Sequence, residues 1–256
     1  MDNKLKSTIG IVAVLVIGIA VTQWFFGQQR PSINSSSTQP EVTDFPAPHF
    51  ENTELGIGFD HSTELSEVVE ATVSGESGTR WSANFHNIPN LQVSATTSDF
   101  APTEWMGNPW WINAKLDSEE NEDVVLQKIK KEMPLALKVE KVTNDKNVSG
   151  FKVYALNCIG FCQLERFFVI PLENADYNNL VITGVLKVMK SPTLAPQAVA
   201  TLGARVAMDV PADYKKNLVE SAPDEIAKIE NGDAETDTLN VIRWQQEIFD
   251  SLELTK

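Results

Sequence analysis

The longest apolar stretch of the chain lies near its start. Residues 7–26, STIGIVAVLVIGIAVTQWFF, carry no charged side chain. As a helix, this stretch spans about 30 Å, which is the thickness of the hydrocarbon core of a bilayer. Lys4 and Lys6 precede it and Trp24 lies near its end, a pattern typical of a signal anchor with a cytoplasmic N-terminus. The sequence therefore predicts a single-pass membrane protein with an extracytoplasmic C-terminal domain.

A cleaved signal peptide is the alternative interpretation of this stretch. Cleavage requires small residues just before the cut, but Phe25 occupies one of these positions in the window that ends at Gly27. The pattern therefore favours an uncleaved anchor. Both interpretations place the rest of the chain outside the cytoplasm.

Residues 27–48 follow the anchor and are rich in Ser, Pro, Gln and Thr. They contain too little apolar surface to offset the entropy of ordering, so we expect a flexible linker. Residues 1–6 then form a cytoplasmic N-terminus, and residues 49–256 form the extracytoplasmic domain.

Alternating apolar and polar positions predict that this domain is rich in strands. We expect strands over residues 55–59, 67–73, 81–85, 91–95, 135–142, 151–157, 162–170 and 180–186. A turn at 74–78 and another at 87–90 would join the second, third and fourth of these strands in an antiparallel meander.

Helical periodicity appears in fewer segments. Acidic residues at 117–123 precede a helix predicted over 124–133, and Pro134 ends it. A helical insertion near 187–235 contains candidates at 195–208 and 222–230, and an amphipathic helix over 240–251 precedes a short strand at 252–254. The pattern predicts an α+β fold around an antiparallel sheet.

The charge balance excludes two classes of partner. The chain has 21 basic and 35 acidic residues and a formal net charge of −14. Binding to nucleic acid or to anionic lipid requires clusters of Lys and Arg, so neither is expected. An acidic surface is typical of a soluble, self-repelling domain.

Two short segments resemble a known family. Residues 52–60, NTELGIGFD, resemble the N-T-x-x-G-[FI]-x-[FL]-x-Y-P start of PsbP-like proteins, and residues 248–254, IFDSLEL, are similar to the closing helix and strand of that family. The start also resembles uncharacterised membrane-anchored bacterial extracytoplasmic proteins. The chain departs from the pattern after Asp60, where His-Ser-Thr replaces the usual Tyr-Pro element. The resemblance implies an αβα-type sandwich around an antiparallel sheet, without enzyme chemistry, used mostly for binding or assembly. We expect no cofactor.

Cys158 and Cys162 form the sharpest local feature. In a continuous strand they would lie about 13 Å apart, too far for a disulfide. A hairpin loop at 159–161 would instead place them opposite each other, and outside the cytoplasm they would be oxidised. Two free thiols, or a redox or metal-binding pair, are the alternatives, although redox pairs are more often separated by two residues and zinc needs two further ligands.

Three tryptophans in a loop containing Gly and Pro are the candidates for recognition: Trp105, Trp110 and Trp111. Exposed aromatic rings stack on sugars or anchor protein partners. The alternative is that the loop folds back and covers an edge of the sheet.

Other polar residues do not predict a metal or catalytic site. The histidines, His49, His61 and His86, are irregularly spaced and are more typical of solvated or capping residues. The acids at 117–123 lack the alternation and glycine of a calcium loop, and Asp233, Glu235 and Asp237 lack its distal Glu.

The sequence therefore predicts a membrane-anchored extracytoplasmic binding or assembly module without catalysis, with a protein partner at the membrane surface. The alternatives are a cell-surface enzyme, such as a hydrolase or a thiol-disulfide protein, and a glycan-binding module.

Overall fold

The chain divides into two compact units, Met1–Phe45 and Pro46–Lys256. The computed structural model describes residues 47–75, 78–88, 91–97, 114–159, 161–173, 176–189 and 212–255, all in the second unit. None of the helices in these ranges is long and apolar enough to cross a membrane. The predicted anchor at 7–26 and the linker up to residue 46 lie outside the described residues.

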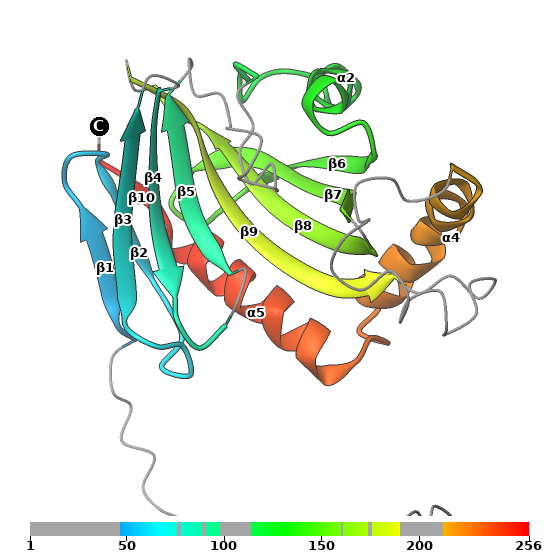
Figure 1. The fold of residues 1–256 in the computed structure, drawn as a ribbon. Coiled ribbons are helices and arrows are strands. Elements are labelled where there is room, and N and C mark those ends of the chain that lie inside the picture. The colour runs from blue at the N-terminus through cyan, green and yellow to red at the C-terminus, as the bar shows by residue number, and fades with distance from the viewer. Residues whose placement is uncertain are drawn as a thin grey trace, which may run out of the picture. The chain divides into compact units, whose positions relative to one another are not determined.

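A seven-stranded sheet, antiparallel throughout, forms the centre of the described domain (Figure 1). Its strand order is β3-β4-β5-β9-β8-β7-β6. The strands span Val68–Gly75 (β3), Gly78–Phe85 (β4), Gln92–Thr97 (β5), Ala136–Thr143 (β6), Ser149–Ile159 (β7), Phe161–Pro171 (β8) and Tyr177–Met189 (β9). The predicted meander is confirmed as β3-β4-β5, and the four later strands form a second meander that β9 joins to β5.

A second, three-stranded sheet contains both ends of the described domain. Its strands are His49–Asn52 (β1), Ile57–Asp60 (β2) and Glu253–Leu254 (β10), in the order β1-β2-β10. The predicted final strand is therefore confirmed as an edge strand paired with β2. Ile57 and Phe59 are buried, as the alternation predicts.

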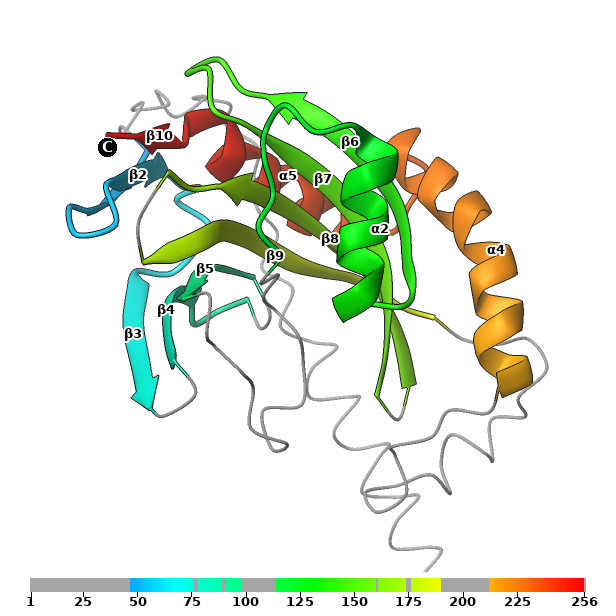
Figure 2. The same ribbon diagram turned by 90° about the horizontal axis from the view of Figure 1, so that it is seen from above.

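Three helices pack on the seven-stranded sheet: Glu122–Glu132 (α2), Ala212–Glu230 (α4) and Thr236–Ser251 (α5). Helix α5 runs along β9, whereas α2 and α4 lie by β6 and β7, at the other end of the sheet from β3 (Figure 2). Antiparallel sheets packed with helices confirm the α+β class. The more specific PsbP-like sandwich stays a prediction.

Three apolar clusters show which face each helix covers. Along β8, Phe168 packs on α5, and its ring stacks on Phe249 with centroids 4.5 Å apart. Leu164 shares that face and packs with α4. Phe167, which points to the other face, packs with Val125 and other residues of α2. Side chains alternate along a strand, so β8 contributes to all three clusters.

The helix boundaries follow from capping and packing. Asn121 caps α2, because its side chain accepts a hydrogen bond from the Asp123 N–H (2.8 Å).

Helix α4 begins at Ala212, earlier than the 222–230 prediction, and runs through Pro223. Proline usually ends a helix because it lacks an N–H. Here Leu218 and Ile226, one on each side of the proline, are both buried in the same cluster, and this packing keeps the helix continuous.

Helix α5 also begins earlier than predicted, at Thr236 instead of residue 240. The Thr238 side chain is buried and donates a hydrogen bond to the Leu186 carbonyl (2.8 Å), which attaches the first turn to β9. Lys187 to Met189, placed in the insertion by the sequence, extend β9. The predicted helix at 195–208 lies outside the described residues.

Candidate functional site

The two cysteines form a disulfide at the tip of the β7–β8 hairpin. Cys158 is directly opposite Cys162 in the strand register, and their Cα atoms are 4.0 Å apart. Cys162 is fully buried, in the cluster that α4 covers. Thiol-disulfide exchange requires a sulfur that an external thiolate can reach. Cys158 is partly buried and packs against the same cluster, so both cysteines contribute to the packing of the hairpin tip, as in a structural cystine.

The predicted recognition loop with Trp105, Trp110 and Trp111 lies outside the described residues. Its role in binding stays a prediction.

The three histidines have different surroundings. His49 contacts the Asp60 carboxylate through Nδ1 (2.7 Å) at an exposed position. His61 is buried with its ring against the edge of the Phe85 ring, and His86 is exposed. Within the described ranges, no three His, Cys, Asp or Glu side chains form a group that could hold a metal ion.

The two acidic segments have local structural roles. The Asp117 carboxylate accepts a hydrogen bond from the Glu119 N–H (2.9 Å), in the turn that leads to α2. Asp233 and Glu235 connect α4 to α5, after Gly232, whose φ of 78° suits the end of a helix. The first segment leads into α2, and the second links α4 to α5.

A different group of residues forms the strongest candidate site. Polar side chains replace the apolar layer on one face of β4, β5 and β9. We call this group the polar patch: Arg80, Ser82, Asn84, Gln92, Ser94, Thr96, Asn179 and Thr183.

The strand register places the polar patch on the face that also carries α2. Ser82 pairs with Ser94, and Ser94 pairs with Val181. Val181 belongs to the cluster beneath α2, so its neighbours in the same row share that face. Arg80 and Gln92 lie two positions from Ser82 and Ser94, respectively, and therefore have the same orientation.

Most of the polar patch is buried, which is unusual for hydroxyl and amide side chains. Ser94 is 1% exposed and Thr183 is 0% exposed. Thr183 Oγ1 is a buried atom with no hydrogen-bond partner in the described part of the chain. Buried polar groups normally have a partner, so this hydroxyl can accept or donate a further bond.

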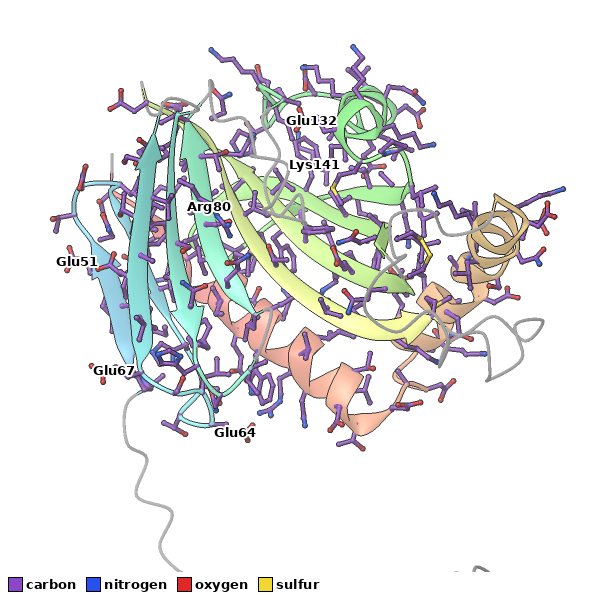
Figure 3. All side chains as sticks on the ribbon, in the orientation of Figure 1. Glu51, Glu64, Glu67, Arg80, Glu132 and Lys141 are labelled. Atoms are coloured by element: carbon purple, nitrogen blue, oxygen red, sulfur yellow. A yellow bond between two sulfur atoms is a disulfide. The ribbon has the colours of Figure 1, made fainter. Side chains whose placement is uncertain are left out.

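Arg80 is the only cationic residue of the polar patch, and Figure 3 labels it on β4. Its Nη2 donates a hydrogen bond to Gln92 Oε1 (3.0 Å), so the side chain extends along the sheet toward Gln92 and its neighbour Thr183. Its Nε is buried and has no hydrogen-bond partner among the residues that the structure describes, and no carboxylate in those ranges forms an ion pair with the side chain. Burial lowers the pKa of the Arg80 guanidinium.

Glu165 lies on the same face, farther along the sheet on β8. It is 1% exposed and accepts a hydrogen bond from Asn157 Nδ2 (3.0 Å). Burial raises the pKa of its carboxyl group to about 7, against a smaller opposing effect of the Asn157 hydrogen bond. This carboxyl group is therefore independent of Arg80 and does not neutralise it.

The sequence analysis did not identify the polar patch. The alternation in residues 80–96 shows which residues share a face, because Trp81, Ala83, Val93 and Ala95 occupy the other positions. Alternation alone suggests that the polar positions are solvated. Their burial follows from the pairing of β5 with β9, which are far apart in the sequence.

Comparison with family models, with curated proteins and with solved structures finds no match to this chain. The resemblance to PsbP-like proteins therefore stays a prediction.

Proposed function

We propose that this chain is a membrane-anchored extracytoplasmic binding or assembly module. Residues 7–26 would anchor it, and the described domain would bind a protein partner at the membrane surface. The observation that carries the proposal is the exposed edge strand β3.

Among the described strands, β3 pairs with β4 alone, so one of its edges has no strand beside it. Its outer residues Val69 and Val73 are 41% and 47% exposed, and they are large hydrophobic side chains. Soluble proteins usually protect such an edge with charge, proline or a bulge. Strand β3 has one charged residue, Glu70, whose carboxylate is already bonded to Asn52 Nδ2 (2.8 Å) and Trp81 Nε1 (2.9 Å). The exposed valines support binding by strand addition, in which a partner continues the sheet.

The disulfide supports an extracytoplasmic location for the domain. Cystines persist in oxidising environments and are rare in the cytosol. Cys158 and Cys162 are bonded at a hairpin tip in the domain that follows the predicted anchor. This agrees with a domain outside the cytoplasm.

The alternatives have less support. A thiol-disulfide protein needs an accessible sulfur, whereas Cys162 is fully buried and Cys158 is partly buried against the cluster that α4 covers. Glycan binding depends on Trp110 and Trp111, which lie outside the described residues.

Substitutions that add positive charge to strand β3 test the proposal. We expect the double variant V69K/V73K to lose the partner, because lysine on an edge strand opposes strand addition. The measurement is the amount of partner that co-purifies with the full chain from detergent-solubilised, cross-linked membranes. It should fall at least about fivefold, a loss of about 1 kcal/mol or more in binding.

V124K is the matched control, because Val124 is 49% exposed but lies on α2. It should retain the partner that the wild type captures. Equal capture by the wild type and by V69K/V73K, or capture of no partner by the wild type, would overturn the proposal.

A further inference from the structure

We propose that the polar patch binds the oxyanion group of a small polar molecule, a carboxylate or a phosphate, and that Arg80 is the residue that contacts it. This inference goes beyond a protein partner on β3, because strand addition needs no cation on this face.

The first argument is the missing counter-ion. An isolated charge in a poorly solvated site is costly unless a group of opposite charge pairs with it. The chain carries 35 acidic residues, yet none in the described ranges forms an ion pair with Arg80. A bound anion would supply the missing charge.

The other arginines in the described ranges show what a satisfied guanidinium looks like here. Arg166, also buried, donates from Nε to Gln245 Oε1 (3.0 Å) and from Nη2 to the Ile242 carbonyl (2.7 Å). Arg243 is exposed and pairs with the Glu64 carboxylate (2.6 Å). Of these three, only Arg80 has a buried Nε without an acceptor.

The second argument is the arrangement of donors around the guanidinium. A guanidinium presents its N–H groups as a planar fork that matches a carboxylate or phosphate. Gln92 fixes the fork through Nη2, which leaves Nε available. Thr183 is directly opposite Gln92 on β9, and its unpartnered hydroxyl can donate to a second oxygen of the same ligand.

This arrangement favours an anionic ligand that also carries hydrogen-bonding groups. Ser82 and Ser94 lie between the Arg80 and Gln92 rows and add hydroxyl groups to the same surface. An apolar ligand would leave Arg80 Nε and the Thr183 hydroxyl without a partner at a cost, so a polar molecule is favoured.

The experiment measures anion binding by the full chain in detergent micelles. Calorimetric titrations with succinate and with inorganic phosphate, each against sodium chloride at equal ionic strength, separate a carboxylate from a phosphate ligand. We expect saturable binding of one of these oxyanions. R80M should weaken it at least about tenfold, and T183V about threefold or more, in line with the loss of a charged and of a neutral hydrogen bond.

R243M is the matched control, because it removes an arginine that is already paired on the surface. It should bind the anion as the wild type does. Saturable binding of neither oxyanion, or an equal loss in R80M and R243M, would overturn the inference.

If R80M does not fold, R80K and T183V provide the test. Lysine keeps the charge but lacks the fork, so R80K should bind more weakly than the wild type. Unchanged affinity in both variants would also overturn the inference. Partner capture by R80M is a separate measurement, so a failure here leaves the proposal for β3 untouched.

Discussion

At the residue scale, the buried ionisable groups distinguish this domain from an ordinary apolar core. Glu165 has a neutral partner, Asn157, and no cation nearby forms an ion pair with it among the described residues. Burial therefore disfavours its charged form and raises its pKa to about 7 from the ordinary 4.5. Because the folded state binds the proton more tightly than the unfolded state, this carboxyl group favours folding at low pH.

The first consequence is a pH dependence of stability. The favourable contribution of Glu165 is complete below pH 4.5 and is lost as the pH rises to about 7. Relative to E165Q, the wild type should lose on the order of 3 kcal/mol of unfolding free energy across this window. Urea denaturation of both proteins at a series of pH values measures it.

Subtracting the two curves removes the contribution of other carboxylates. Glu225, for example, has a pKa lowered by hydrogen bonds from Lys228 and Lys187, and this effect is common to both proteins. Glutamine keeps the acceptor for Asn157. Parallel curves for the wild type and E165Q would show that Glu165 titrates normally.

At the scale of the elements, the contact between α5 and β9 depends on a glycine. A Cβ atom on Gly184 would lie 2.7 Å from Gln245 Cδ and 2.8 Å from Val241 Cγ1. Gln245 is buried and bonds to Arg166 twice, because its Nε2 also donates to the Arg166 carbonyl (2.8 Å). The helix therefore has little freedom to move away.

We expect G184A to destabilise the domain by about 1–3 kcal/mol, as overpacking of a core does. Thermal and chemical unfolding measure it. G58A is the matched control, because a Cβ on Gly58 of β2 would meet the exposed His49 ring at 3.4 Å and the Phe50 carbonyl oxygen at 3.6 Å, without a clash. If G58A lost as much unfolding free energy as G184A, the result would contradict the explanation by packing.

The elements also show how far the sequence predicts the fold. Alternation identified β4 and β5, and the acidic residues at 117–123 placed the start of α2 within two residues of Glu122, because these signals are local. The start of α4 was not predicted, because contacts with distant strands keep the helix continuous at Pro223. The polar patch was not predicted for a similar reason, since its burial depends on pairing between distant strands.

At the scale of the whole described domain, its C-terminal segment is bonded to strands and turns from earlier in the sequence. Asn144 Nδ2 donates to the carbonyls of Phe249 (2.7 Å) and Leu252 (2.9 Å), and the Asp60 N–H donates to Ser251 Oγ (2.9 Å). Strand β10 then pairs with β2. The C-terminal segment is thus part of the fold, next to the strands that begin the domain.

The two proposed binding sites, strand β3 and the polar patch, are neighbours in the seven-stranded sheet. The edge strand β3 and the polar patch lie on the same end of the seven-stranded sheet, because β3 pairs with β4. The disulfide lies at the tip of the β7–β8 hairpin, away from the paired segments of β3 and β4. A protein partner and a small anion would therefore bind close to each other, whereas the cystine would stabilise a different part of the domain.

The central claim is that this domain is displayed outside the cytoplasm on a membrane anchor. The most direct measurement is protease accessibility of the full chain, with a C-terminal epitope tag, in spheroplasts or intact cells that express it. The account predicts that the intact chain sediments with membranes and that external protease removes the tag without permeabilisation. An intact chain in the soluble fraction, or a tag protected until the membrane is opened, would contradict the account.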